Sequence, residues 1–375
     1  MNDRILIFGD VCPTDDTRAA FESGKGESLF GDLLPMIKDS AYCIANLECT
    51  ITDQPTPIKK CGPVLYGSTK CMHTLADAGI NAVSLANNHI RDCGDTGVAD
   101  TLNTCDQNGI AHFGAGATIE EAAKAHRFEV AGRKFAVCSF CEREFTHITE
   151  GRMGGKPLDV FEDYDRVAAL KAEVDYLIVL FHGGIENHRY PSPLLQKKCR
   201  KFIDSGADLV LIQHSHCIGA LEDYHGGKIL YGQGNSIFGY RKGNKMWNEG
   251  LLVSLKVGEG VSVELLPIET VYGGRVGLAK NPSSISQPLL ERSVMVTDAA
   301  FIQQQWEEFC NSIEPLYFSM LYGHNLQTNR LNRLLKNRII RWFYTKWQLN
   351  VTNNLIRCDA HREVVETLLD KYLYE

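Results

Sequence analysis

The sequence predicts an α/β fold in which buried strands alternate with helices in layers. Short apolar runs rich in β-branched residues alternate with segments of helical periodicity between residues 4 and 267. Polar side chains follow directly after several of these strands. Because α/β sheets bind ligands beyond the carboxyl ends of their parallel strands, we expect the functional site at that edge.

Length and composition set the broad class of protein. The 375 residues exceed the usual single-domain range, which predicts one large α/β domain with an appendage. A net charge of −7 gives no reason to expect a nucleic-acid partner. The thirteen cysteines follow no regular spacing, and no export signal precedes the first strand, so we expect reduced thiols and a cytoplasmic location.

Three strands in the first third of the chain end in metal-binding types of side chain. Any one of these residues alone would be read as a turn or cap residue. Three such ends in series favour a shared site instead. The strands and their polar ends are Arg4–Phe8 with Asp10, Tyr42–Leu47 with Asn46 and Glu48, and Ala82–Leu85 with Asn88, His89 and Asp92.

Two later strands end in histidine. Tyr176–Phe181 runs into His182, and Leu209–Ile212 is followed by His214 and His216. A single histidine at a loop start is more often an ordinary hydrogen-bonded residue. Three imidazoles from neighbouring strands favour one half of a metal site.

The remaining elements fill the layers around these strands. Residues 53–70, rich in Pro, Gly and Lys, form a loop that is a candidate cover for the site. We expect helices at Leu29–Met36, Thr69–Ala78, Val98–Asn108, Leu158–Val174 and Pro193–Ser205, and further strands at Ala111–Gly116, Arg127–Val130, Lys134–Phe140, Lys228–Tyr231, Leu251–Val257 and Val261–Pro267.

From residue 282 glycine becomes scarce and helical periodicity prevails. This change predicts a domain of residues 1–281 and a helical appendage of residues 282–375. The appendage should contain helices Asp298–Asn311, Gln327–Tyr344 and Arg362–Tyr374. Residues 315–357 include seven basic residues and no acidic one. The amphipathic pattern fits packing on the main domain. The same pattern also fits a segment 323–347 that lies at an anionic membrane surface or binds an anionic polymer.

Seven motifs in order resemble the CapA family of bacterial capsule and poly-γ-glutamate biosynthesis proteins, within the calcineurin-like metallophosphoesterase superfamily. The resemblance covers residues 4–268 and not the appendage. The motifs are Gly9-Asp10, Asn46-Leu47-Glu48, Ala86-Asn87-Asn88-His89 with Asp92 and Gly94, His182-x-Gly184-x-Glu186, Gly206-Ala207-Asp208, His214-x-His216 and Gly234-Asn235-x-x-Phe238.

The resemblance implies a four-layered α/β/β/α sandwich that holds one or two divalent metal ions (Mn, Fe or Zn) at the strand ends. His89, oriented by Asp92, takes the place of the superfamily's catalytic histidine. The implied metal ligands are Asp10, Glu48, Asn88, His182, His214 and His216. Asn46, Glu186, Arg189 and Asn235 are candidates for substrate binding or for supporting the ligands.

The sequence also departs from the superfamily's pattern at the metal site. Cys12 stands where a histidine ligand is usual, Glu48 where an aspartate is usual, and Gln213 where glycine is common. His182 is followed by Gly183, where many relatives have tryptophan. These changes leave the first metal position with fewer ligands.

Two classes of function follow from the resemblance. The first is a metal-dependent phosphoesterase that acts on a phosphorylated precursor in capsule or cell-surface polymer synthesis. The second is a non-hydrolytic accessory protein for synthesis or export of an anionic polymer such as poly-γ-glutamate. A third possibility is a ligand-binding protein with a structural metal. A peripheral position at the inner membrane face would involve segment 323–347.

Overall fold

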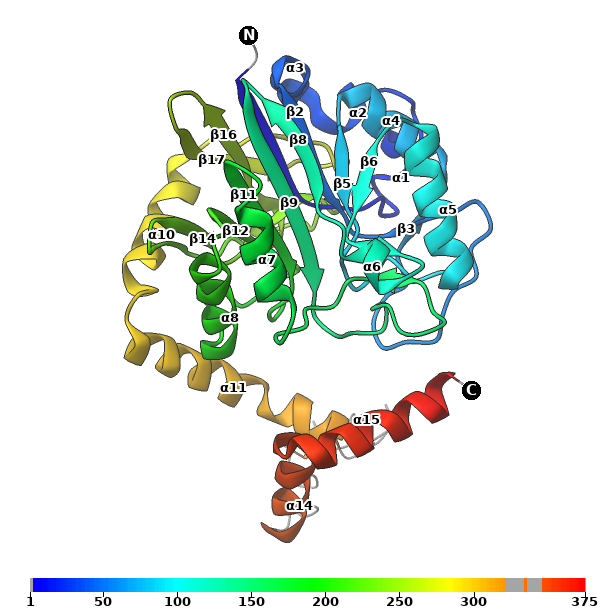
Figure 1. Ribbon diagram of the computed structural model, residues 1–375, viewed down its shortest axis with the longest axis vertical. Coiled ribbons are helices and arrows are strands. Elements are labelled where there is room, and N and C mark those ends of the chain that lie inside the picture. The colour runs from blue at the N-terminus through cyan, green and yellow to red at the C-terminus, as the bar shows by residue number, and fades with distance from the viewer. Residues whose placement is uncertain (1–2, 322–333, 336–345, 375) are drawn as a thin grey trace. The chain divides into compact units, whose positions relative to one another are not determined.

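The computed structural model describes residues 3–321, 334–335 and 346–374 (Figure 1). The chain divides into two compact units, residues 1–306 and residues 307–375. Within the described residues, the first unit contains two large sheets. Apart from residues 334–335 and 346–347, the predicted helix Gln327–Tyr344 and the segment 323–347 lie outside the described residues.

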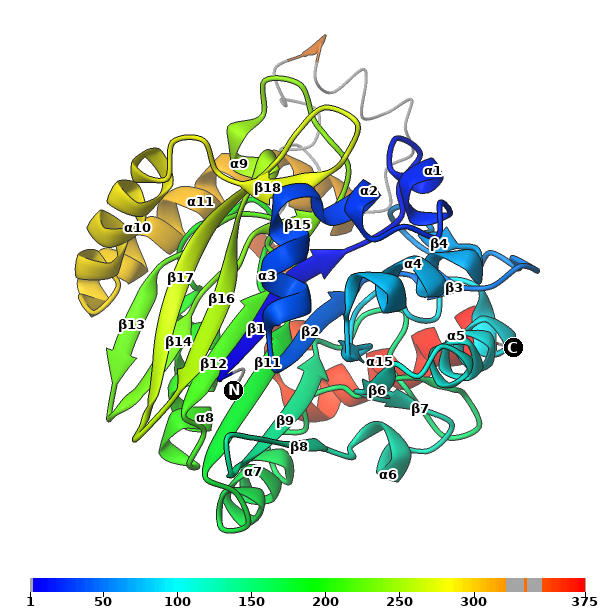
Figure 2. The same ribbon diagram turned by 90° about the horizontal axis from the view of Figure 1, so that it is seen from above.

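The first sheet has eight strands in the order β18-β17-β16-β1-β2-β5-β6, with β15 paired to β1 (Figure 2). Strands β1, β2, β5, β6 and β15 run parallel, and β16, β17 and β18 are antiparallel. The bounds are β1 (Arg4–Val11), β2 (Tyr42–Leu47), β5 (Ala82–Ser84), β6 (Ala111–Phe113), β15 (Asn235–Ile237), β16 (Glu249–Val257), β17 (Val261–Thr270) and β18 (Val276–Leu278).

The second sheet has six strands in the order β13-β14-β12-β11-β9-β8. Its four central strands are parallel, with an antiparallel strand at each edge. The bounds are β8 (His126–Val130), β9 (Arg133–Cys141), β11 (Tyr176–His182), β12 (Leu209–Gln213), β13 (Leu221–Tyr224) and β14 (Gly227–Leu230). Two small pairs join β3 (Thr50–Ile51) to β4 (Tyr66–Gly67) and β7 (Ala115–Gly116) to β10 (Gly154–Gly155).

Helices cover the outer face of each sheet, with α3, α4 and α5 on the first and α7 and α8 on the second (Figures 1 and 2). The first set of helices is α1 (Arg18–Phe21), α2 (Glu27–Phe30), η1 (Gly31–Leu33), α3 (Leu34–Asp39), α4 (Lys70–Ala78) and α5 (Gly94–Gln107). The others of this unit are α6 (Ile119–Ala122), α7 (Asp163–Lys171), α8 (Pro193–Asp204), α9 (Lys245–Asn248) and α10 (Ser283–Met295).

Three apolar cores separate the four layers. In β11, Ile178 and Leu180 point into the core between the sheets, whereas Leu177 and Phe181 point into the core beneath α7 and α8. This alternation follows from the two-residue period of a strand. Because both faces are covered, the strand is apolar at every position, as parallel strands of α/β proteins are. The predicted α/β/β/α sandwich is confirmed.

The predicted boundary after residue 281 differs from the observed division, which falls after Trp306. Helix α10 is the reason. Its Ile285 and Leu289 belong to the core between the sheets, and the Gln196 side chain in α8 donates a hydrogen bond to the carbonyl of Val296. These apolar and polar contacts hold α10 on the first unit.

The longer described stretches of the second unit, residues 307–321 and 346–374, are almost entirely helical. Helix α11 (Ala299–Leu321) crosses the division, and α14 (Lys346–Arg357) and α15 (Asp359–Tyr374) contact each other. Among residues 3–321, 334–335 and 346–374, no helix combines the length and the apolar composition that crossing a bilayer requires.

Truncation of Leu180 tests the core between the sheets. We expect Leu180→Ala to lower the free energy of unfolding by about 2–5 kcal/mol, because a fully buried side chain leaves a cavity. Urea denaturation followed by circular dichroism measures the change. The matched control is Leu194→Ala, since Leu194 is 63% exposed at the start of α8. Equal midpoints for the two variants would contradict the assignment.

Candidate metal centre

The predicted ligand residues lie close together at the C-terminal ends of parallel strands from both sheets. Each follows or ends a parallel strand, so the two sheets bring residues far apart in the chain to one place. The contributing residues are Asp10 of β1, Glu48 after β2, Asn88 after β5, His182 of β11, and His214 and His216 after β12. All are buried except Asn88, which is half-buried.

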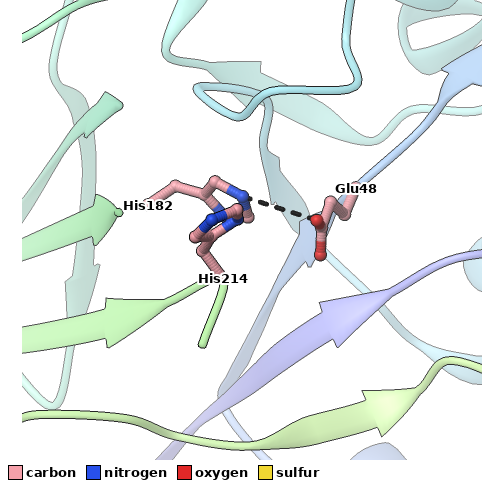
Figure 3. A group of neighbouring side chains, drawn as sticks. All are labelled: Glu48, His182 and His214. Carbon is pink, nitrogen blue, oxygen red and sulfur yellow. Dashed lines mark ion pairs between the residues drawn. The ribbon is translucent and has the colours of Figure 1, made fainter. Parts of the chain in front are cut away.

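Two donor groups form within this set. Glu48, His182 and His214 make one group (Figure 3), and Asp10, Glu48 and His216 make the other. In each group, one ligand atom per residue lies within 4.8 Å of the others. Glu48 belongs to both groups, so its carboxylate stands between two possible ion positions.

Asn88 joins the first group through its side-chain oxygen. Its Oδ1 lies 2.9 Å from Nε2 of His182, and the same Nε2 lies 3.4 Å from Glu48 Oε1. Figure 3 shows the imidazole of His182 directed at the Glu48 carboxylate. The six predicted ligands are therefore neighbours in space.

Unpartnered buried atoms indicate that a cation fits here. Both carboxylate oxygens of Glu48 and Nδ1 of His214 are buried without a hydrogen-bond partner among the described residues. An ionised carboxylate buried without a partner is strongly destabilising, and coordination to a metal ion is one of the few arrangements that compensates it. The mixed oxygen and nitrogen donors suit Mn, Fe or Zn.

The electrostatics of the site agree with this fit. Burial raises the pKa of Asp10 to about 7, and the nearby Glu48 charge adds to the rise. Burial also raises the pKa of Glu48 well above its ordinary value. Burial lowers the pKa of His182 and of His214 to about 4, and that of His216 well below its ordinary value. Neutral imidazoles keep a lone pair for a metal ion.

Asn46 and Asn235 flank Asp10 on the neighbouring strands and orient the ligands. In the sheet register, Asp10 pairs with Asn46 on β2 and with Asn235 on β15. The Asn46 amide donates to Asp10 Oδ1 at 2.7 Å. Asn235 donates to the carbonyl of Trp247, so its Oδ1 accepts from Nδ1 of His216 at 2.9 Å. That bond leaves Nε2 of His216 free to bind a metal ion.

Of the two roles expected for Asn46 and Asn235, these contacts agree with support of the ligands and not with substrate binding. Both side chains are at most 1% exposed and lie behind the ligands. The other two candidates are more accessible. Glu186 is exposed. Burial of Glu48 is the main cause of its raised pKa, and the charge of Glu186 adds to the rise. Burial lowers the pKa of Arg292, and the nearby charge of Arg189 lowers it further. Substrate contact by Arg189 stays a prediction.

The backbone of the histidine turn is strained. His214 has φ 88° and His216 has φ 51°, a left-handed region that residues other than glycine seldom adopt. The amide of His214 donates to Asp10 Oδ2 at 3.1 Å, which helps to hold the turn. Strain of this kind persists only where the surroundings enforce it, and it clusters at functional sites.

His89 and Asp92 form a buried pair beside the two donor groups. Nδ1 of His89 lies 2.6 Å from Asp92 Oδ2, and Nε2 of His89 lies 3.9 Å from Glu48 Oε1. A carboxylate only accepts hydrogen bonds, so the Nδ1 of His89 carries the proton. The ring therefore presents its other nitrogen to the donor groups.

Two residues near the site were missed from the sequence. Lys60, from the loop between β3 and β4, reaches Asp92 and His89. Glu144, which follows β9, places Oε1 3.8 Å from Nε2 of His214. The loop 53–70 was recognised as a candidate cover, but no spacing rule selects Lys60 within it. Cys12 is fully buried and belongs to neither donor group, which leaves the group of Asp10 and His216 with three ligands.

Comparison with known families decides the relationship. The family model described as "Bacterial capsule synthesis protein PGA_cap" matches residues 4–240. The chain belongs to this family. The CapA resemblance drawn from the motifs is thereby confirmed.

Curated relatives of this chain carry matching names. It is 26% identical over 237 residues to the PGA biosynthesis protein CapA of Bacillus subtilis (62% of each chain). It is 25% identical over 243 residues to the capsule biosynthesis protein CapA of Bacillus anthracis (62% of this chain, 59% of that one). The chain thus spans about three fifths of the length of these two CapA proteins.

Solved structures are more distant. A 5'-nucleotidase precursor from Thermus thermophilus has a TM-score of 0.41 and 11% identity, over 84% of this chain and 59% of that one. A hypothetical protein from the same organism has a TM-score of 0.45 and 15% identity, over 70% of this chain and 99% of that one. Neither likeness is strong enough to assign an activity.

Removal of the shared carboxylate tests the two donor groups. We expect Glu48→Gln to weaken Mn²⁺ binding at least about tenfold, because both groups lose their common charged ligand. Isothermal titration calorimetry measures the affinity. The control is Glu129→Gln, on an exposed position of β8, which should bind as the wild type does. Unchanged affinity in Glu48→Gln would exclude this site.

The raised pKa of Asp10 predicts that metal affinity depends on pH. A proton on Asp10 competes with the ion until the pH passes about 7. The affinity for Mn²⁺ should therefore increase from pH 6 to pH 8, with protons released on binding. Calorimetry in buffers of different ionisation enthalpy counts these protons. Affinity that stays constant over this range would show that Asp10 is ionised before the metal binds.

Proposed function

We propose that the chain is a metal-dependent phosphoesterase in the synthesis of a bacterial capsule or another cell-surface polymer. The two buried donor groups that share Glu48 carry this proposal, because they supply places for two ions side by side. A pair of metal ions that share a carboxylate ligand suits the hydrolysis of phosphate esters. Membership of the capsule synthesis family supports the biological setting.

The metal ions when bound would supply a nucleophilic hydroxide at neutral pH and neutralise charge on the phosphate. Asp10, Glu48 and Asn88 would contribute oxygen ligands, and the three histidines would contribute nitrogen ligands. Zn, Mn or Fe suits this set. Asn46 and Asn235 hold Asp10 and His216 in place through the hydrogen bonds already described.

His89 is the proposed proton donor. Asp92 holds its ring with the proton on Nδ1, and Nε2 faces the donor groups. When Nε2 is also protonated, it can donate that proton to the leaving oxygen of the ester and stabilise the charge that develops there. The substrate of such a reaction would be a phosphorylated small molecule or polymer precursor.

A second candidate function is favoured by one relative. The chain is 28% identical over 268 residues to a probable polyglutamine synthesis accessory protein of Mycobacterium tuberculosis (64% of this chain, 69% of that one). An accessory protein would bind an anionic polymer such as poly-γ-glutamate near the metal centre without cleaving it.

Turnover of a generic ester separates these candidates. We expect Mn²⁺-dependent hydrolysis of p-nitrophenyl phosphate or its diester, lost on addition of EDTA. Both His214→Ala and Asp10→Asn should lower kcat/KM by at least about 100-fold, since each removes a metal ligand.

The matched control is His225→Ala, because that histidine side chain is 67% exposed and takes no part in the metal centre. Absence of metal-dependent turnover in the wild type would reject the phosphoesterase. Binding of poly-γ-glutamate by the same inactive protein, measured by calorimetry, would then favour the accessory function.

A further inference from the structure

Lys60 occupies an unusual position for a lysine in a loop. Its side chain is 2% exposed, whereas the neighbouring Lys59 is exposed. The loop between β3 and β4 is fastened to the turn that carries Asn88, His89 and Asp92. Ile58 donates its amide hydrogen to the carbonyl of Asp92 at 2.9 Å. This hydrogen bond holds the loop so that the Lys60 side chain points inward.

The Lys60 ammonium contacts three residues of that turn. Its Nζ lies 2.5 Å from Asp92 Oδ1 and 3.1 Å from the carbonyl oxygen of Asn88. It also lies 3.1 Å from Nδ1 of His89, which carries a proton and therefore does not accept a hydrogen bond from it. Phe145 lies beside it, with the ring centroid 5.9 Å from Nζ. A buried ammonium needs acceptors, and Asp92 and Asn88 supply them.

The two carboxylate oxygens of Asp92 therefore bind different partners. Oδ1 accepts from Lys60, and Oδ2 accepts from Nδ1 of His89 and from the amide of Leu65. Asp92 is fully buried, and Lys60 neutralises its charge. Because Oδ1 is occupied, Asp92 presents Oδ2 to the imidazole in one orientation, and this fixes the direction of His89 Nε2.

We infer that Lys60 is a positioning residue that holds the His89–Asp92 pair in the geometry required for proton donation. The inference rests on the proposed function, in which His89 is the proton donor. Direct contact of Lys60 with a substrate is excluded by the burial of its side chain. Among the described ligand residues, Lys60 hydrogen-bonds only the carbonyl oxygen of Asn88. Its charge also opposes the rise in the pKa of Glu48 that burial causes. We therefore expect the larger effect on catalysis and a smaller one on metal binding.

The variant Lys60→Met keeps the length of the side chain and removes its charge, and Lys59→Met is the matched control. We expect Lys60→Met to lower kcat for p-nitrophenyl phosphate by about 10- to 100-fold, the usual range for loss of such a supporting contact. KM should change less than about twofold, and Mn²⁺ affinity should change by less than about tenfold. In Lys60→Ala, added propylammonium should restore part of the activity, and tetramethylammonium should not.

A second measurement does not depend on turnover. With ¹⁵N-labelled histidine, the His89 signals are assigned by comparison with His89→Gln. The metal-free wild type should show a single form of His89 protonated at Nδ1. In Lys60→Met, these signals should broaden or report a mixture of the two tautomers. Thermal unfolding of each variant verifies that it is folded.

Either of two results would overturn the role of Lys60. One is an unchanged His89 spectrum together with unchanged kcat in Lys60→Met. The other is an unchanged His89 spectrum with Mn²⁺ affinity at least about tenfold weaker, which would make Lys60 a support of the metal centre. If the wild type has no turnover, the proposed phosphoesterase fails, whereas the His89 spectrum still decides whether Lys60 positions the ring.

Discussion

The burial of two carboxylates beside three neutral imidazoles is the constraint on which this structure depends. Asp10 and Glu48 lie at the ends of adjacent parallel strands, where the sandwich excludes water, and neither oxygen of Glu48 has a hydrogen-bond partner among the described residues. Such an arrangement is unfavourable without a cation. The surrounding sheets, each closed by its own helices, supply the packing energy that keeps these groups in place.

Much of the site could be predicted from local sequence pattern. A strand that ends in a carboxylate or histidine is visible as an apolar run followed by a polar residue, and parallel strands place such ends at one edge. The six ligand positions follow from this rule and the family motifs. The sequence left open whether Asn46 and Asn235 support the ligands or bind substrate. Their roles depend on the sheet register, which brings residues 36 and 225 positions away beside Asp10.

The errors in secondary structure have local physical causes. The helix expected at 29–36 is interrupted at Gly31, whose φ of 47° ends α2 and starts a new turn. The helix expected from Leu158 begins only at Asp163, because the Asp163 carboxylate accepts bonds from Lys156 and from the amide of Asp159. Lys60 was missed for a related reason: the path of its loop is set by hydrogen bonds to a distant turn, which composition does not reveal.

The central place of β1 has a consequence for the order in which the protein can form. Asp10 lies in a strand that pairs with β15 and β16. Its sheet partner Asn235, and Trp247, whose carbonyl accepts a hydrogen bond from Asn235, emerge from the ribosome long after it does. A nascent chain that ends before β15 therefore lacks two of the three strands that pair with β1. Such nonlocal pairing slows folding. The support that Asn235 gives to Asp10 and His216 is thus added only after all six ligand residues have been synthesised.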